Sequence, residues 1–415
     1  MGLAVMVVTA LAHLINSRLG ALLLLVAAAY YLLATKGSIY ERLLRLIVYA
    51  APYYSFSIFG DRQRLSMCIV AVAILCVLLT FNMLKRGARV SAGSTCKLLL
   101  FLIFLAAYCL SVFFGSYTRK EAIFTTYQLV ILAYLVFIIP VSGNEELSDI
   151  DTDELMQLFV RGICAITITL YIQYGAYTAF GISLGEVYEF NSDRVIFNVY
   201  FNAKSMLSLY LALGMLYYFT AYINKKRIAD LVWLAIFVGA VWINHSRTGL
   251  GCFAVCAALY CLLHMKQIVS SIRVTAMLIL IMAAGLYIVQ YMLETRASLE
   301  GIADDNGRME HIVEAFRILP NYIFYGIGGS ATDYLLSSIG VTIHNFIMAY
   351  LVQFGVMGGL AVNSLIISPV FGRRNAYWYY LCCVLIGGLL FANWQNVLYI
   401  VPVYILFLLE EGKVR

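Results

Sequence analysis

Long hydrophobic runs, separated by short polar or charged segments, follow one another along almost the whole chain. Most of these runs reach the roughly 20 residues that an α-helix needs to cross a bilayer. The pattern predicts about 12 to 14 membrane-spanning helices, of which the first two are short and could form a tilted hairpin. The predicted helices cover residues 2–15, 19–34, 42–58, 65–84, 97–117, 121–140, 157–181, 199–223, 229–244, 248–265, 272–293, 344–371, 376–393 and 395–410.

Composition narrows the class of protein. Of the 415 residues, 63% are hydrophobic and 12% are charged, whereas ordinary soluble domains are roughly 45–50% apolar and about 25% charged. A water-soluble fold is excluded, and we expect no nucleic-acid partner. A transmembrane β-barrel would show alternating segments of about 10 residues instead of continuous runs such as residues 65–84. We therefore expect an all-α polytopic membrane protein with a single transmembrane domain over residues 1–415.

The distribution of Lys and Arg predicts the orientation of the helices. When the N-terminus is placed in the cytoplasm, seven of the nine Lys residues fall on the cytoplasmic side, as the positive-inside rule requires. Both termini are then cytoplasmic, and two long segments, residues 182–197 and 294–343, form loops on the outer side. The acidic segment 145–154 falls on the cytoplasmic side without a basic residue, but acidic residues contribute little to orientation.

The connection between two of the predicted helices contains a candidate phosphate-binding residue. Arg247 lies there, at the outer membrane boundary, with His245 and hydroxyl-bearing residues beside it. A guanidinium group can hold a phosphate at head-group depth, because its planar fork donates two parallel hydrogen bonds. The alternative is a turn residue whose side chain extends to the polar interface.

A second group of polar residues enters a helix from the shorter outer loop. Arg194 is followed by Asn198 and Asn202, whose spacing of four places both on one face of a helix. They would form a polar stripe one turn inside the membrane boundary. The alternative is an ordinary helix start at which an Asn serves as the N-cap.

The large outer loop and the helix after it supply the remaining candidates. Arg308 opens a predicted helix within the loop. The glycine-rich segment 326–329 could approach an anion with its backbone N–H groups, and the alternative is a simple turn. His344, followed by Asn345, begins the next helix. A His in this position could act as a general base, or it could be a cap or interface residue of the helix start.

No group of His and acidic residues has the spacing of a metal site, so we expect no metal and no cofactor. Binding of a metal at the paired acids Asp304 and Asp305 is the alternative. Most of the ten Cys residues are embedded in hydrophobic runs and act as small apolar residues.

In their order along the chain, these motifs resemble the O-antigen polymerase and ligase superfamily of bacterial polysaccharide assembly. Four features carry the resemblance, which is concentrated in residues 185–360. The sequence departs from the family pattern at residues 195–197 and 309–311, which follow Arg194 and Arg308. The four features are Arg194 with Asn198 and Asn202; Ser246-Arg247-Thr248-Gly249-Leu250; Gly307-Arg308 leading through Pro320 to Gly326-Ile327-Gly328; and His344-Asn345 with Gly355 and Gly358 downstream.

The resemblance implies a GT-C-like fold in the bacterial inner membrane, with the active site facing the periplasm. Residues 182–197 would be the first periplasmic loop, and the large loop at residues 294–343 would cover the site. The implied activity is that of a metal-independent glycosyltransferase acting on an undecaprenyl-pyrophosphate-linked oligosaccharide. Membrane lipids would surround the enzyme, and a chain-length regulator protein could be its partner.

Particular residues take roles from the same resemblance. Arg194, Arg247 and Arg308 would hold the pyrophosphate leaving group, and His344 would be the acid–base or acceptor-positioning residue. The physical reason is that cleavage of a sugar–phosphate bond develops negative charge on pyrophosphate, which guanidinium groups stabilise without a metal. The remaining substrate-binding residues would be Asn198, Asn202, His245 and Asn345.

Within the superfamily we expect a polymerase, which transfers the growing glycan from polyprenyl pyrophosphate onto another lipid-linked repeat unit. An O-antigen ligase, which transfers the glycan to lipid A-core, is the alternative. A transporter of lipid-linked saccharides is a second alternative. It is disfavoured because we find no inverted repeat and expect no charged or broken segment near the middle of the spans.

Overall fold

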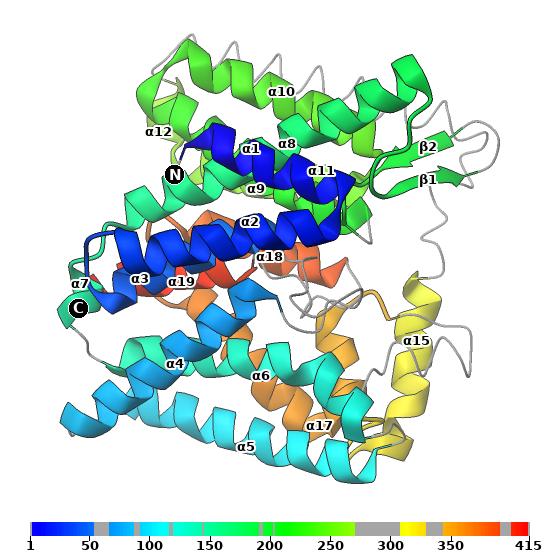
Figure 1. The fold of residues 1–415 in the computed structure, drawn as a ribbon. Coiled ribbons are helices and arrows are strands. Elements are labelled where there is room, and N and C mark those ends of the chain that lie inside the picture. Colours follow the sequence, from blue (N-terminus) through cyan, green and yellow to red (C-terminus); the bar gives the residue numbers. More distant parts are fainter. Residues whose placement is uncertain are drawn as a thin grey trace.

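The computed structural model is that of an almost entirely helical protein (Figure 1). The predicted helix at residues 272–293 lies outside the described residues, and each of the other predicted runs contains a helix of the structure. The structure describes residues 2–53, 66–86, 92–115, 119–142, 145–190, 194–201, 204–269, 308–328, 343–390 and 400–413.

The helices form two groups with a pair of helices between them (Figure 1). The first group is α1 (Leu3–Ile15), α2 (Ser17–Ala29), α3 (Ile39–Ala50), α8 (Thr152–Phe180), α9 (Lys204–Lys225), α10 (Ile228–Asn244) and α11 (Arg247–Leu263). The second is α4 (Met67–Arg86), α5 (Ala92–Phe114), α6 (Arg119–Ser142) and α17 (Phe346–Ile367). The pair between them is α18 (Trp378–Leu389) and α19 (Ile400–Lys413), and the short helices are α7 (Glu145–Ser148), α12 (Met265–Val269) and α15 (Arg308–Ile318).

The described helices have the length and surface of membrane-spanning segments. Six of those in the described ranges are long and apolar enough to cross a bilayer, and several shorter apolar helices accompany them. Large hydrophobic side chains such as Leu33, Phe81 and Phe180 are more than half exposed on the outside of the bundle. Such a surface is unfavourable in water but suits contact with lipid. The protein is therefore an all-α polytopic membrane protein.

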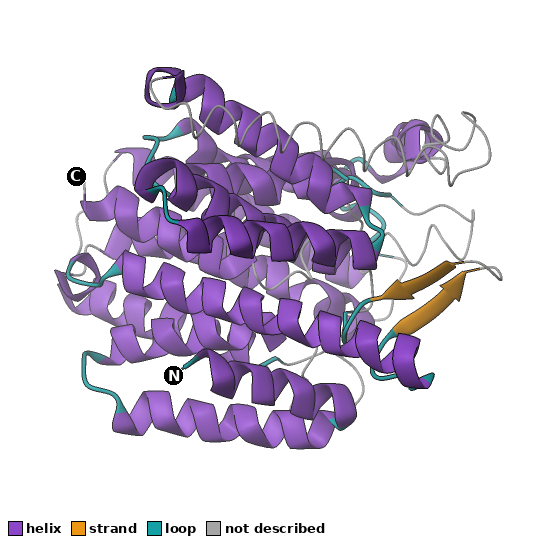
Figure 2. Ribbon diagram, turned by 90° about the horizontal axis from the view of Figure 1, so that it is seen from above, coloured by secondary structure: helices purple, strands orange, loops and turns teal. Residues whose placement is uncertain are grey.

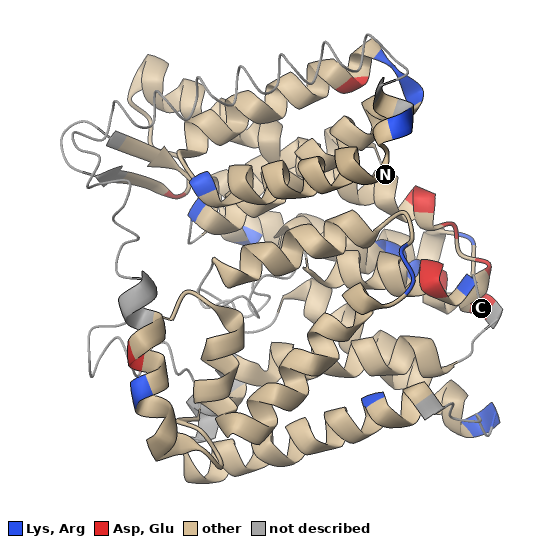
Figure 3. Ribbon diagram, turned by 180° about the vertical axis from the view of Figure 1, so that it is seen from behind, with Lys and Arg blue, Asp and Glu red and all other residues tan. Residues whose placement is uncertain are grey.

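Both chain termini lie at the same end of the helix bundle, which we call the termini side (Figures 1 and 2). Figure 3 shows Lys and Arg residues gathered at this end. The acidic segment 145–154, which includes α7, lies there as well (Figure 1). Its Glu154 Oε2 accepts a hydrogen bond from Arg45 Nη2 at 2.9 Å. Segment 145–154 contains no basic residue of its own, but Arg45, which is distant in the sequence, forms an ion pair with it.

The opposite end, which we call the hairpin side, carries two antiparallel strands, β1 (Val187–Phe190) and β2 (Arg194–Phe197). The hydrophobic pattern predicted a loop in this region and did not predict strands. Helix α15 lies at the same end and runs across the direction of the bundle helices (Figures 1 and 2). The hairpin side therefore holds the described parts of both predicted outer loops.

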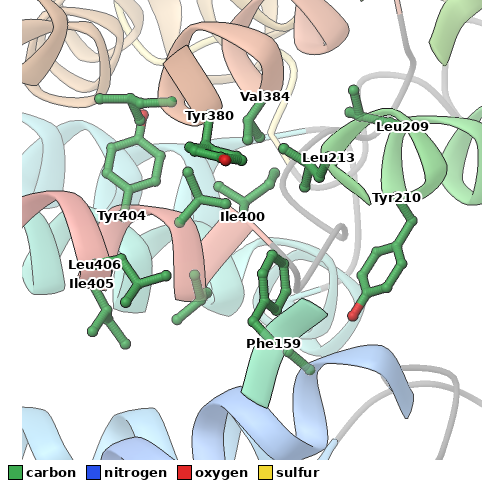
Figure 4. Packing of buried hydrophobic residues seen from close by; sticks show 14 of the residues in the cluster. Phe159, Leu209, Tyr210, Leu213, Tyr380, Val384, Ile400, Tyr404, Ile405 and Leu406 are labelled. Atoms are coloured by element: carbon green, nitrogen blue, oxygen red, sulfur yellow. The ribbon is translucent and has the colours of Figure 1, made fainter. Parts of the chain in front are cut away.

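Helices α18 and α19 contact both groups of helices, and α3 also packs directly on α4. Side chains from α8, α9, α18 and α19 meet in the centre of the hydrophobic core, among them Phe159, Tyr210, Tyr380 and Tyr404 (Figure 4). Each of these is at most 6% exposed. The hydroxyl of Tyr404 donates to the carbonyl oxygen of Ile366 in α17 at 2.7 Å. A buried phenol needs such a partner, and this bond ties α19 to α17.

Candidate functional site

Arg247 is the first residue of α11 and lies on the hairpin side, after a connection of two residues from α10. His245 makes the reversal with a φ of 54°, and its backbone N–H donates to the carbonyl oxygens of Val241 (3.1 Å) and Trp242 (3.2 Å). The side chain of Arg247 is exposed. Its charge adds to the positive end of the α11 dipole, so this position favours an anion.

Helices α9 and α11 approach each other closely beside Arg247. Ser208 Oγ of α9 accepts hydrogen bonds from Ser246 Oγ (2.9 Å) and from the backbone N–H of Gly249 (3.1 Å). A Cβ at Gly249 would collide with the carbonyl oxygen of Ser208. Small residues allow membrane helices to pack backbone against backbone in this way. The contact fixes the start of α11 and therefore the position of the Arg247 backbone.

Replacing Gly249 with alanine is expected to push α11 away from α9 and to destabilise the protein. The added Cβ overlaps backbone atoms, and overpacking of this kind costs roughly 1–3 kcal/mol. The measurement is the midpoint of thermal unfolding of the purified protein in detergent. Gly251→Ala is the matched control, because a Cβ there would meet no atom within 4 Å. Equal midpoints for the two variants would contradict the close approach.

A pair of buried amides joins the first outer loop to α10. The fully buried Asn244 donates from Nδ2 to Asn198 Oδ1 (2.9 Å) and to the carbonyl oxygen of Phe197 (3.0 Å). The prediction that Asn198 lies on a helix face with Asn202 is wrong, because Asn198 is not helical and the next residue, Val199, has a left-handed backbone. Asn202 itself lies outside the described residues. Asn198, which is 2% exposed, holds the loop against the end of α10.

Gln173 of α8 closes the base of the β1–β2 hairpin. Its Nε2 donates to the carbonyl oxygens of Leu184 (2.6 Å) and Glu186 (3.2 Å), and its Oε1 accepts from the backbone N–H of Val199 (2.9 Å). Val199 has a φ of 57°, which is costly for a β-branched residue. The bond to Gln173 offsets part of this cost, and the left-handed backbone at this point keeps α9 from starting at Val199 as predicted.

Arg194 and Arg308 each open an element on the hairpin side. Arg194 is the first residue of β2, where it pairs with Phe190, and Arg308 is the first residue of α15. Their side chains lie outside the described part of the structure. The backbones of these two residues and of Arg247 are thus at the same end of the bundle.

His344 and Asn345 lie just before α17. Asn345 is the N-cap of this helix, and its Oδ1 accepts hydrogen bonds from the backbone N–H groups of Ile347 (3.0 Å) and Met348 (3.3 Å). An Asn in this geometry satisfies helix donors that would otherwise lack partners. His344 is left directly outside the helix and is half-buried.

Helix α17 is interrupted at Gly355, which has a φ of 72° and a ψ of 176°. The break releases the carbonyl oxygens of Val352 and Gln353. They accept hydrogen bonds from the backbone N–H groups of Ile327 (2.9 Å) and Gly328 (3.1 Å). The glycine-rich turn of the large loop is therefore inserted into the break of α17, and the two glycine motifs predicted from the sequence are in direct contact.

In the described part of the glycine-rich turn, residues 326–328, the backbone donors are used within the protein. The N–H of Gly326 donates to the carbonyl oxygen of Tyr322 at 3.1 Å, in addition to the bonds from the next two residues to α17. On the other side of the turn, a Cβ at Gly328 would meet Ser111 and Gly115 of the α5 region. Residues 326–328 form a packing element between α5 and α17, and the N–H groups of these three residues are not arranged as an anion cradle.

The hairpin also presents an aromatic ring on the side of the site. Tyr188 of β1 is 39% exposed, and its hydroxyl donates to Glu186 Oε2 at 2.8 Å. Partial burial and the neighbouring Glu186 carboxylate raise the pKa of Tyr188 to about 12. The phenol therefore stays neutral at physiological pH, and the partly exposed ring is of the kind on which the C–H groups of a sugar pack.

Three residues that organise this region were not predicted from the sequence: Asn244, Gln173 and Ser208. Gln173 and Asn244 were detectable as amides inside hydrophobic runs, where a polar side chain must find a partner. Ser208 carried no signal, since a single serine in a membrane helix is common.

Among the described residues, no group of three or more His, Cys, Asp or Glu side chains is arranged to hold a metal ion. Asp304 and Asp305 lie outside those residues. No protein-family model matches the chain, and no curated protein matches its sequence.

Proposed function

We propose that the protein is an O-antigen polymerase, a glycosyltransferase that moves a growing glycan from polyprenyl pyrophosphate onto a lipid-linked repeat unit. One observation carries the proposal. The start of α11, with the exposed Arg247, is fixed on the hairpin side by hydrogen bonds of Asn198, Asn244 and Ser208. The backbones of Arg194 and Arg308 lie at the same end of the apolar bundle. A cationic surface at a membrane boundary suits a lipid-linked pyrophosphate.

In the proposed reaction, the bond between the anomeric carbon of the donor and its pyrophosphate breaks, and a hydroxyl oxygen of the acceptor sugar forms the new bond. The three guanidinium groups stabilise the charge that develops on the leaving pyrophosphate. His344 takes the proton of the acceptor hydroxyl or orients that hydroxyl. Alignment of the two lipid-linked substrates supplies the rest of the rate.

The proposal includes an orientation in the bacterial inner membrane. The termini side is cytoplasmic, because Lys and Arg gather there (Figure 3). The hairpin side then faces the periplasm, where the large loop at residues 294–343 covers the substrates. The described part of this loop, at residues 308–328, contacts α17 and α5.

A transporter of lipid-linked saccharides is the second candidate, and the break in α17 favours it. The sequence predicted no broken segment within a span, and that prediction is wrong at Gly355. Transporters often bind substrate at broken helices. In this protein, however, Ile327 and Gly328 occupy the break and pair with its free carbonyl groups, so the break contributes to packing and we favour the enzyme.

The test is a gel ladder of the surface glycan from a strain lacking the protein, complemented with the wild type or with His344→Ala. A polymerase deletion should leave lipid A-core carrying one repeat unit, with wild type restoring the ladder and His344→Ala failing to do so. Loss of all attached glycan, with polymer accumulating on the lipid carrier, would identify a ligase instead. Loss of repeat units from the periplasmic face would identify a transporter.

A further inference from the structure

A pocket of about 540 Å³ opens at the termini side, at the end of the bundle opposite Arg247. Four parts of the chain contribute to it: the start of α8, the end of α9, the end of α11, and the segment before α18 together with the first turn of α18. This volume is in the range of pockets that bind small molecules. The residues that line it include Asp153, Lys225, Tyr260, His264, Arg374 and Tyr379.

The inner wall of the pocket is built from tyrosine rings that hold one another in place. The ring of Tyr260 stacks on His264, with centroids 4.2 Å apart and an interplanar angle of 17°, and meets Tyr379 edge-on at 4.9 Å. The hydroxyl of Tyr260 donates to Asn224 Oδ1 at 3.1 Å. Tyr260 and Tyr379 are less than 10% exposed. The wall is therefore held in place by contacts within the protein.

The ring of His264 is oriented by the protein. Its Nδ1 lies 3.0 Å from the carbonyl oxygen of Tyr260 and 3.4 Å from the hydroxyl of Tyr379. A ring nitrogen beside a carbonyl oxygen carries the proton, so Nδ1–H is the donor in that contact. The imidazole is thus held in the wall of the pocket by these contacts.

The rim of the pocket is cationic. Lys225 and Arg374 are both exposed at its mouth, and Arg374 is held by the ring of Trp378, with its Cζ 5.0 Å from the ring centroid. Asp153 is the acidic residue of the lining, and its Oδ1 accepts the hydroxyl proton of Tyr377 at 2.9 Å. Burial raises the pKa of Tyr377, so its hydroxyl remains a donor to that carboxylate.

Further basic residues lie near the mouth of the pocket. Lys226, Arg227 and Arg373 lie on the same connections, Lys266 lies in α12, and all four are exposed. Asp230 is an acidic residue near Arg227 and Lys225. The lining carries two basic residues, Lys225 and Arg374, against the acidic Asp153, and an excess of positive charge in a concave site attracts anions. A pocket with a cationic rim and an aromatic floor at a membrane boundary suits a phosphate ester whose phosphate meets Lys225 and Arg374 while its organic part rests on the tyrosine wall.

We propose that this pocket on the termini side binds a phosphate ester with a small polyol group, such as the head group of an anionic glycerophospholipid or a soluble sugar or glycerol phosphate. Arg374 donates hydrogen bonds to the phosphate oxygens and Lys225 supplies a second charge. The polyol lies against Tyr260 and Tyr379. The site is at the far end of the bundle from Arg247, so the inference does not depend on the proposed glycosyltransferase activity.

The experiment uses the full chain in nanodiscs and measures the midpoint of thermal unfolding. In one arm the lipid is phosphatidylcholine with an increasing share of phosphatidylglycerol. In the other arm the lipid is phosphatidylcholine alone and glycerol 3-phosphate is added to the buffer. A ligand that binds only the folded protein raises the midpoint as its concentration increases, so the two arms distinguish a lipid head group from a free phosphate ester.

Matched variants on the same connection locate the effect. Arg374→Gln should raise the concentration of ligand needed for half of the stabilisation about tenfold, as expected for the loss of a hydrogen bond to a charged group. Arg373→Gln removes the same charge from the neighbouring exposed residue, which does not line the pocket, and should leave that concentration unchanged. The same comparison is made on the α9–α10 connection with two single variants. Lys225→Gln removes a charge from the pocket lining, and Lys226→Gln, outside the lining, is its control.

Stabilisation in either arm, reduced by Arg374→Gln and by Lys225→Gln but not by the two control variants, would support the proposal and name the source of the phosphate. Stabilisation in neither arm would overturn it. Equal responses of Arg373→Gln and Arg374→Gln would also overturn it, because they would attribute the effect to the general charge of this surface.

Discussion

Replacing Arg247 with alanine is expected to abolish the glycan ladder while the protein still accumulates in the membrane. The side chain is exposed at the start of α11, so its removal leaves no cavity in the core. Loss of one group that stabilises developing charge in a transition state costs about 10²–10³ in rate. The measurement is the ladder of the complemented deletion strain, together with the amount of protein in the membrane fraction.

Two further variants separate the charge from its geometry. Arg247→Lys keeps the charge but loses the planar fork that donates two parallel hydrogen bonds, so it should give a faint ladder of short chains. Arg317→Ala is the control, because Arg317 lies on α15 at the same end of the bundle and its side chain is 80% exposed. A normal ladder with Arg247→Ala would remove Arg247 from the proposed site.

The helices of this protein could be predicted from the sequence because a membrane imposes their length and composition. A span must satisfy its backbone groups internally and present apolar side chains to lipid, and both conditions leave a continuous hydrophobic run. The predicted run at residues 229–244 matches α10 to within one residue. The acidic segment 145–154 was also predicted on the same side as both termini, and it lies at their end of the bundle, where Arg45 contacts it.

The region around Asn198 was predicted less well, because tertiary contacts override the local pattern there. Residues 187–190 and 194–197 are rich in aromatic and β-branched residues and are separated by a short polar segment, which is a hairpin signal. The hydrophobic run that follows suggested a helix from residue 199 onwards. The single amide of Gln173, 26 positions away, holds Val199 in a left-handed conformation instead, and periodicity contains no information about that contact.

The glycines near His344 illustrate the same limit. Gly355 and the turn at residues 326–329 were both identified from the sequence, one as part of a helix and the other as a turn or an anion site. The contact between Gly355 and the turn could not be predicted, because neither motif contains information about the position of the other in the fold. Together they form a joint in which the large loop completes the hydrogen bonding of a broken helix.

Replacing Gly355 with alanine is therefore expected to be among the most damaging single substitutions in the chain. Its φ of 72° and ψ of 176° fall in a region that is essentially restricted to glycine and that costs other residues roughly 1–3 kcal/mol. An added Cβ would also meet backbone atoms of Phe324 at 2.8 Å. With the overlap included, we expect a loss of about 3 kcal/mol or more in the free energy of unfolding.

The readout is the midpoint of thermal unfolding in detergent, with Gly175→Ala as the control. Gly175 is a helical glycine of α8 with no atom within 4 Å of an added Cβ, and alanine there should stabilise the helix by up to about 1 kcal/mol. The two substitutions add the same methyl group, so opposite shifts of the midpoint would trace the cost to the joint with the large loop. If Gly355→Ala unfolds at the wild-type temperature, α17 can close its break into a regular helix, and the loop is not needed to complete it.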